Sequence, residues 1–232
     1  MPARAIAPPA DNAPSAPADA SAARKARFWN RIAVRYAADP IADEAGYEAT
    51  LRRVQGLLSA DLEVLEIGCG TGTTALRLAP FTRRLLATDV SARMIDIARR
   101  KLAAEPLPQL SFAVADADAP VAGDGEYDAV LAFNLLHLVT DLEQALELAM
   151  RALRPGGLLI SKTPCLAEMN PLIRYLALPV MQAIGKAPHV LCFGADALRS
   201  AIARQGMDIV SVERHGTRGK DFRVFIVARK PA

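Results

Sequence analysis

Apolar residues along this chain fall into short continuous runs, and longer amphipathic stretches separate them. Runs such as 64–67 and 127–133 are rich in branched side chains and carry few charges. Such runs are typical of strands that are buried on both faces of a parallel sheet. Between them, apolar positions recur every three or four residues, which is typical of helices that pack on a sheet. The alternation of the two patterns predicts an α/β fold.

The pattern also predicts where each element lies. Strands are expected at 62–67, 85–89, 110–115, 127–133, 158–160, 208–214 and 222–228. Helices are expected at 24–38, 44–59, 92–102, 142–153 and 195–205, and a further helix is expected to begin at Thr73. Pro40 ends the first of these helices and Gly206 the last.

The first part of the chain does not share this pattern. Residues 1–23 are nearly all Ala, Pro, Ser and Asp, which bury too little apolar surface to offset the entropy of ordering. We expect a disordered tail there, and the acids and prolines argue against a transit peptide. Residues 24–232 then form one domain of ordinary size. Two parts of it lie outside the alternating pattern, namely the N-terminal helices at 24–59 and a proline-interrupted insertion at 164–194.

The first predicted strand runs directly into three glycines, Gly68, Gly70 and Gly72. Glycines permit a tight turn and let a ligand approach the backbone. Ligands of open α/β sheets bind beyond such strand ends, where helix N-termini present unpaired N–H groups. The spacing G-x-G-x-G differs from the dinucleotide fingerprint, whose third glycine comes one residue later. We therefore predict a ligand site at this loop.

An acid follows the second predicted strand, about twenty residues beyond the glycine loop. A carboxylate at this place, Asp89, can accept hydrogen bonds from the two vicinal hydroxyls of a ribose. The alternative role is to cap the helix at 92–102, although Ser91 suits that role better.

Four stretches together carry a family resemblance. They are VLEIGCGTG at 64–72, LLATD at 85–89, YDAVLAFNLLHL at 127–138 and LRPGGLLI at 153–160. In this order they resemble the motifs of class I S-adenosylmethionine-dependent methyltransferases, of the small-molecule, ubiquinone-biosynthesis-like type (methyltransferase type 11). The resemblance implies a Rossmann-like, mostly parallel sheet of seven strands with helices on both faces and an antiparallel last strand. It also implies S-adenosylmethionine as the cofactor and a small-molecule methyl acceptor.

The resemblance assigns cofactor contacts to the glycine loop and to the ends of the predicted strands. Asp89 is the implied ribose ligand, and Asp116 the implied partner of the adenine amine, with Asp118 as its rival. Met94 matches a position that packs near the adenine, although helix-core packing is the alternative. The implied set is Tyr36, Glu66, Gly68, Cys69, Gly70, Asp89, Val90, Met94, Asp116, Ala117 and Asn134.

The helix at 24–38 resembles an N-terminal helix that folds over the cofactor in many small-molecule methyltransferases. In that case Trp29 and Tyr36 shield the sulfonium and the substrate from water. Alternatively, the apolar residues of this helix only pack on the hydrophobic core.

Methyl transfer from a sulfonium is an in-line displacement, which chiefly requires that the acceptor and the methyl group be held close, aligned and dry. A hydroxyl or acidic-carbon acceptor also needs a base, and His137 is the best candidate because its ordinary pKa lies near neutrality. A histidine that only packs at a helix start is an equal alternative. His189 and His215 have weaker claims.

Two features of the sequence limit which classes of methyl acceptor we expect. Asn134 precedes Leu135-Leu136 and not the Pro-Pro-aromatic run of enzymes that methylate nucleobases or protein amides. The insertion at 164–194 is rich in Leu, Ile, Val and Met but is broken too often by proline to span a membrane. We expect it to cover the mouth of the site and to favour a hydrophobic acceptor. Contact with a membrane surface or an apolar partner is the competing interpretation and is not favoured.

Composition excludes several other classes. The net charge is +3 with both signs interspersed, so we expect no nucleic-acid partner. The three cysteines are widely spaced and include no C-x-x-C pair, which argues against a disulfide framework and a zinc site. Carboxylates are not clustered, so no metal site is expected. A reducing cytoplasm fits best, and the oligomeric state stays open.

Two rival functions also stay open. A non-catalytic protein that binds an adenosyl cofactor would keep the same pocket. An NAD-dependent oxidoreductase would share the ribose acid, but it should carry the later third glycine and a proton donor such as Tyr-x-x-x-Lys, neither of which occurs here.

Overall fold

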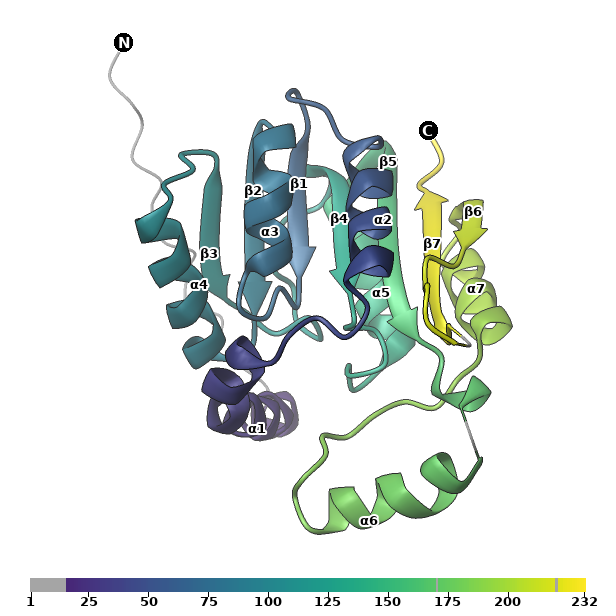
Figure 1. The fold of residues 1–232 in the computed structure, drawn as a ribbon. Helices are drawn as coiled ribbons and strands as arrows, with labels where there is room; N and C mark the ends of the chain where they lie inside the picture. Colours follow the sequence, from purple (N-terminus) through teal and green to yellow (C-terminus); the bar gives the residue numbers. More distant parts are fainter. Residues whose placement is uncertain (1–15, 170, 220) are drawn as a thin grey trace.

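A mixed sheet forms the centre of the protein. The computed structural model of the chain describes residues 16–169, 171–219 and 221–232. The strand order is β3-β2-β1-β4-β5-β7-β6, and β7 is antiparallel to both of its neighbours while the other pairs are parallel (Figure 1). The strands are β1 Glu63–Ile67, β2 Arg84–Asp89, β3 Leu110–Val114, β4 Tyr127–Phe133, β5 Leu153–Pro164, β6 Asp208–Glu213 and β7 Arg223–Arg229. The predicted fold class is confirmed.

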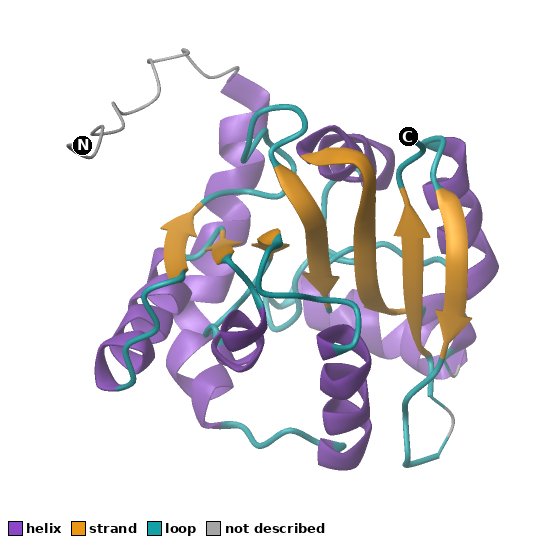
Figure 2. Ribbon diagram, turned by 90° about the horizontal axis from the view of Figure 1, so that it is seen from above, coloured by secondary structure: helices purple, strands orange, loops and turns teal. Residues whose placement is uncertain are grey.

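Helices cover both faces of this sheet, as the view from above shows (Figure 2). The helices are α1 Ala16–Ala38, α2 Glu44–Gln55, α3 Thr73–Leu78, α4 Ala92–Ala104, α5 Leu142–Ala152, α6 Leu178–Ala183 and α7 Ala195–Arg204. Short turns of other helix types occur at Ala79–Phe81, Leu166–Glu168 and Ile173–Ala177. One layer consists of α2, α3 and α4, and the opposite layer consists of α5 and α7.

The central strands are buried on both faces, which explains their nearly continuous apolar sequence. On β4, Val130 and Ala132 belong to the core beneath α5 and α7. Their neighbours Ala129 and Leu131 belong to the core beneath α2, α3 and α4. Each strand residue therefore packs on one of two hydrophobic layers, as expected for a parallel sheet between helices.

Most predicted boundaries lie within a few residues of the observed ones, and the first helix is the main exception. It begins at Ala16, eight residues before the predicted start at Arg24, and so extends into the predicted tail. Its first turn contains Pro17, which a helix tolerates there because the first N–H groups have no partner within the helix. Residues 1–15, the rest of the predicted tail, lie outside the described residues.

The carboxyl ends of the parallel strands point toward α1 and α6 (Figure 1). The chain leaves the sheet at the end of β5, forms the short α6 and returns to the core at α7. Several apolar side chains on this excursion are exposed, among them Leu176, Val180 and Ile184. Among the helices of the described segments, none has the length and apolar character that a bilayer crossing requires.

The side chain of Asn30 hydrogen-bonds α1 to the start of α4. Asn30 Oδ1 accepts hydrogen bonds from Ser91 Oγ at 2.7 Å and from the backbone N–H of Arg93 at 3.0 Å. Ser91 in turn caps α4 by accepting from the N–H of Met94 at 3.1 Å. Asn30 therefore extends the helix cap and fixes α1 against the rest of the domain.

We predict that Asn30→Ala releases α1 from α4. The change removes two hydrogen bonds, each of which contributes about 1 kcal/mol, so tryptic cleavage within α1 should accelerate roughly tenfold or more. Limited proteolysis followed by mass spectrometry measures this rate. Val34→Ala is the control, because that side chain is exposed on the same helix. Equal cleavage rates in the two variants would contradict the prediction.

Candidate functional site

The glycine loop follows β1 and has an unusual backbone. Gly68, Gly70 and Gly72 have φ angles of 69°, 55° and 73°, a region that other residues rarely adopt. A Cβ on Gly68 or Gly72 would lie 2.5 or 2.7 Å from a neighbouring side chain, whereas a Cβ on Gly70 would meet only the Tyr36 ring at 3.8 Å. The two outer glycines thus let the loop pack on the protein, and Gly70 faces an open groove.

This groove collects the residues that the sequence assigned to the cofactor. It is lined by Tyr36, Glu66, Gly68, Cys69, Gly70, Asp89, Val90, Met94, Asp116, Ala117 and Asn134, which is the whole predicted set. The structure adds further lining residues that the sequence analysis did not assign to the cofactor, namely Lys25, Thr74, Ala115, Phe133, Leu135, Leu138 and Val139, and Trp29 also lines the groove.

Asp89 lies at the end of β2 and is held by two backbone groups. Its Oδ2 accepts from the N–H of Gly70 at 3.0 Å, and its Oδ1 accepts from the N–H of Ser91 at 2.8 Å. Burial raises the pKa of this carboxyl group, and the two N–H donors counteract the rise. Each oxygen keeps a further lone pair, so the carboxylate can still accept from a ligand.

Glu66 is the most deeply buried acid of the groove, with 2% of its surface exposed. Within the described part of the chain its Oε2 has no hydrogen-bond partner. Burial, with a smaller contribution from the charge of Asp89, raises the pKa of Glu66 to about 8. The carboxyl group therefore holds a proton at neutral pH and would give it up to a cationic ligand.

Cys69 lies between two of the loop glycines, and its thiol is buried. Burial raises the pKa of this thiol well above its usual range, so the group is neutral. The backbone N–H of Cys69 donates to the carbonyl of Thr88 at 2.8 Å, which ties the loop to β2.

A cation from α1 reaches one end of the groove. Lys25 Nζ lies 2.5 Å from Asp116 Oδ1 and 2.5 Å from Asp118 Oδ2. Both acids that the sequence proposed for the adenine amine are therefore engaged by one ammonium. The sequence gave no signal for this pair, because Lys25 lies 91 residues from Asp116 and no local motif links them.

Asn134 and Tyr36 stand where three cavities meet. Both line the groove, a polar cavity beside it and an apolar cavity beneath the chain segment around α6. Asn134 has a φ angle of 52°, and its N–H donates to the carbonyl of Lys162 at 2.7 Å. A strained backbone at a strand end next to a cavity is typical of a functional position.

The apolar cavity has a volume of about 350 Å³ and contains His137. Among the described residues the Nδ1 atom of His137 has no hydrogen-bond partner. Burial lowers the pKa of His137 to about 4, so the imidazole is neutral at physiological pH. Of the other histidines, His189 is exposed. His215 bonds to Thr50 and Glu213 away from this cavity.

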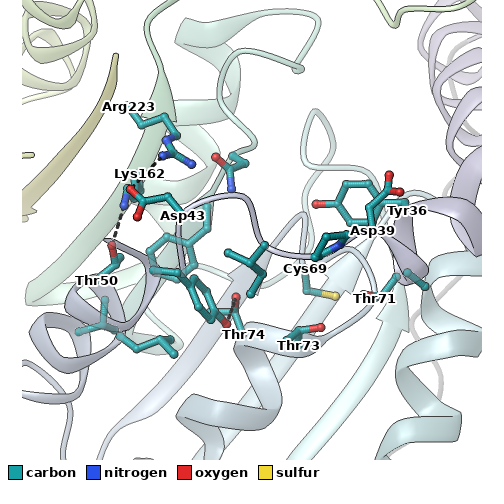
Figure 3. A pocket seen from close by; sticks show the side chains of 18 residues that line it. Tyr36, Asp39, Asp43, Thr50, Cys69, Thr71, Thr73, Thr74, Lys162 and Arg223 are labelled. Atoms are coloured by element: carbon teal, nitrogen blue, oxygen red, sulfur yellow. Dashed lines mark hydrogen bonds and ion pairs between the residues drawn. The ribbon is translucent and has the colours of Figure 1, made fainter. Parts of the chain in front are cut away.

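The polar cavity, so named for the charged side chains at one end of its mixed lining, has a volume of about 310 Å³. It lies between the α1–α2 connection and the ends of β4, β5 and β7 (Figure 3). Lys162, Arg223, Asp43 and Thr50 gather at one end of it, and Tyr36 stands at the other. The sequence analysis did not select these residues. Lys162 follows an apolar strand, and an exposed lysine at a strand end would give the same pattern.

Comparison with known proteins shows similarity to methyltransferases. A family model described as "Methyltransferase domain" matches residues 64–157. The methyltransferase GfsG of Streptomyces halstedii is 34% identical over 122 residues, which cover 51% of this chain and 44% of that protein. The ubiquinone biosynthesis O-methyltransferase of Methylocella silvestris is 30% identical over 131 residues, which cover 55% of this chain and 49% of that protein.

A solved structure supports the fold over a longer stretch. The S-adenosylmethionine-dependent methyltransferase of Mesorhizobium loti superposes with a TM-score of 0.67 at 21% sequence identity, covering 80% of this chain and 98% of that one. In the sequence comparisons, by contrast, the chain spans about half the length of those two curated relatives.

We predict that the titration of Glu66 makes the folded protein less stable as pH rises. The folded-state pKa of about 8 exceeds the ordinary 4.5, so between these values the folded chain keeps a proton that the unfolded chain has lost. The free energy of unfolding therefore falls as pH rises through this window. Urea unfolding of the wild type and of Glu66→Gln at several pH values measures the effect. The variant should lose this part of the pH dependence, and parallel pH profiles would disprove the assignment.

Proposed function

Because this chain belongs to the class I S-adenosylmethionine-dependent methyltransferases, we propose that it transfers a methyl group from that cofactor to a small, hydrophobic acceptor by in-line displacement. The observation that carries the proposal is that the residues assigned to the cofactor from sequence all line one groove. When bound, S-adenosylmethionine supplies an electrophilic methyl group on a sulfonium.

The polar groups of the groove suit the parts of such a cofactor. Asp89 keeps lone pairs for the two ribose hydroxyls, because its backbone donors use only part of its capacity. Asp116 would accept from the adenine amine in exchange for its bond with Lys25. Glu66 lines the groove, and its Oε2, which has no hydrogen-bond partner among the described residues, would accept from the methionyl ammonium. Gly70 leaves the space that a closely approaching ligand needs.

The walls of the site would exclude water from the reacting atoms. Trp29 and Tyr36 stack edge to face with ring centroids 6.2 Å apart, and both line the groove and the apolar cavity. Met94 lines the groove from α4 and belongs to its buried face. A dry site of this kind favours displacement at a sulfonium, because the protein then needs to supply alignment more than acid or base.

The acceptor would enter through the apolar cavity. Leu166, Met169, Leu178 and Val190, from the segment at 164–194, line it together with His137. We assign this segment the role of a substrate cap. A relative named for ubiquinone biosynthesis fits an apolar acceptor of this kind.

We base the proposed cellular compartment of the protein on the state of its cysteines. Cys69, Cys165 and Cys192 all carry free thiols. Free thiols persist in a reducing environment, so we propose that the protein works in the cytoplasm.

We expect Asp89→Asn to weaken binding of S-adenosylhomocysteine roughly 10- to 100-fold, because the ribose loses a charged acceptor. Calorimetric titration measures the dissociation constant. Asp96→Asn is the matched control, since Asp96 is exposed on α4 and should leave the affinity unchanged. Titration with NAD accompanies both variants. Binding of NAD in place of the adenosyl ligand would overturn the proposal, and adenosyl binding without methyl transfer to any acceptor would indicate a binding protein.

If His137 accepts a proton during methyl transfer, we expect the rate of methyl transfer to fall at acid pH, where the imidazole is already protonated. Its pKa of about 4 means that the imidazole stays neutral as pH falls from 8 to 5 and is protonated only near 4. The rate of S-adenosylhomocysteine formation should therefore be flat over the neutral range and fall toward pH 4. In His137→Asn the rate should be lower and this limb absent. An inflection near pH 6.5 that disappears in the variant would contradict the structure.

A further inference from the structure

Two basic side chains share one end of the polar cavity. Lys162 on β5 pairs in register with Phe225 on β7, and Arg223 lies two residues before Phe225 on the same face of that strand. Lys162 and Arg223 are thus diagonal neighbours, a placement that long side chains bridge easily. Both line the cavity, and both side chains lie at the same end of it (Figure 3).

Lys162 is a buried cation with spare donors. Only 7% of its surface is exposed. Its Nζ donates to Thr50 Oγ1 at 2.7 Å, and among the described residues no carboxylate oxygen lies within 4.0 Å of it. An ammonium group has three donors, and a buried one is almost always paired with an anion. Within the described residues Lys162 therefore lacks the anionic partner that a buried ammonium usually has.

Burial and the charge of Arg223 lower the pKa of Lys162, and the charges of Asp221 and Asp43 counteract this shift. These two acids form no ion pair with Lys162 within 4.0 Å, because other donors hold them. Asp43 accepts from the N–H of Gly46 at 3.1 Å and from the N–H and hydroxyl of Thr217 at 2.8 and 2.5 Å. These bonds lower the pKa of Asp43 to about 2. Asp221 accepts from the N–H groups of Gly216 and Arg223 at 2.7 and 3.0 Å.

Arg223 also keeps donors available. Its Nε lies 3.3 Å from Asp221 Oδ1, and its Nη2 lies 3.9 Å from Asp43 Oδ2, which is too long for a hydrogen bond. Among the described residues the side chain of Arg223 donates a hydrogen bond only from Nε, to Asp221, so its Nη groups keep donors for a planar anion.

We propose that Lys162 and Arg223 form a carboxylate-binding subsite, and that the methyl acceptor is an apolar molecule that carries a carboxylate. This inference rests on the proposed function and names the substrate class for it. The polar cavity and the apolar cavity meet at Tyr36 and Asn134, beside the groove. An acceptor whose carboxylate binds Lys162 can thus place its apolar body beneath the α6 segment and its reacting atom at this junction.

The carboxylate of the cofactor itself is the other source of the same chemistry. Cys69 and Thr74 line both the groove and the polar cavity, so the two spaces are adjacent. S-adenosylhomocysteine carries this carboxylate and 5′-methylthioadenosine lacks it. Comparing the affinities of the two ligands therefore separates a cofactor subsite from an acceptor subsite.

The test uses the full chain saturated with S-adenosylhomocysteine and titrated with 4-butylbenzoate or its neutral analogue 4-butylbenzamide. The only tryptophan of the chain, Trp29, lines the groove and the apolar cavity and reports binding by fluorescence. We expect the acid to bind the wild type roughly 10- to 100-fold more tightly than the amide, as for a hydrogen bond to a charged group. Lys162→Gln should abolish this preference and Arg223→Gln should reduce it.

Arg229→Gln is the matched control, because this exposed arginine lies at the opposite end of β7 and should keep the preference. Affinity for S-adenosylhomocysteine, unchanged in all variants, shows that they fold. Equal binding of acid and amide by the wild type, or no binding of either, overturns the subsite. Weaker binding of S-adenosylhomocysteine but not of methylthioadenosine by Lys162→Gln also overturns it and assigns the cation to the cofactor. Failure of the wild type to bind S-adenosylhomocysteine would instead overturn the proposed function.

Discussion

The strand order imposes the constraint on which the rest of this structure depends. β1 lies between β2 and β4. From the carboxyl end of β1 the chain therefore builds β2 and β3 toward one edge of the sheet, and then crosses back to place β4 on the other side of β1. Such a reversal opens a crevice at the strand ends, where backbone N–H groups are unpaired. Gly70 lies in that crevice and donates to Asp89 of the neighbouring strand end. The groove, the strained Asn134 and the two cavities all lie at the carboxyl ends of the strands, where the connection after β1 and the connection after β4 diverge.

Local sequence was sufficient to predict the alternating α/β pattern, the glycine loop and the acid after β2, whereas the seven-stranded sheet and the other groove residues were predicted from the family resemblance. The branched run of β1, the loop glycines and the acid after β2 each have a local physical cause, namely burial, positive φ angles and a strand end. Lys25 and Lys162 were not predictable in this way. Their importance arises from contacts between residues distant in sequence, such as Lys25 with Asp116 and Lys162 with Thr50. The early start of α1 was missed because an Ala-rich composition fits both a tail and a helix.

Two buried ionisable groups lower the stability of the free protein, and both line cavities in which a ligand could bind. Glu66 stays protonated because burial disfavours its charge, and Lys162 keeps donors that no anion among the described residues uses. Packing alone would favour apolar residues at both positions. Opposite charges on ligands would relieve both, so the free protein is less stable than its fold permits. The two groups lie on different strands, so Glu66 could respond to the proposed cofactor and Lys162 to the proposed acceptor.

The bond between Lys25 and Asp116 has a kinetic consequence. A nucleoside that uses Asp116 must displace an ammonium, whereas an open groove would offer it only water. That ammonium belongs to a helix roughly 35 Å long, which Asn30 also holds at its middle. Entry of such a ligand would therefore require the Lys25 side chain to leave Asp116, which would slow binding relative to an open groove.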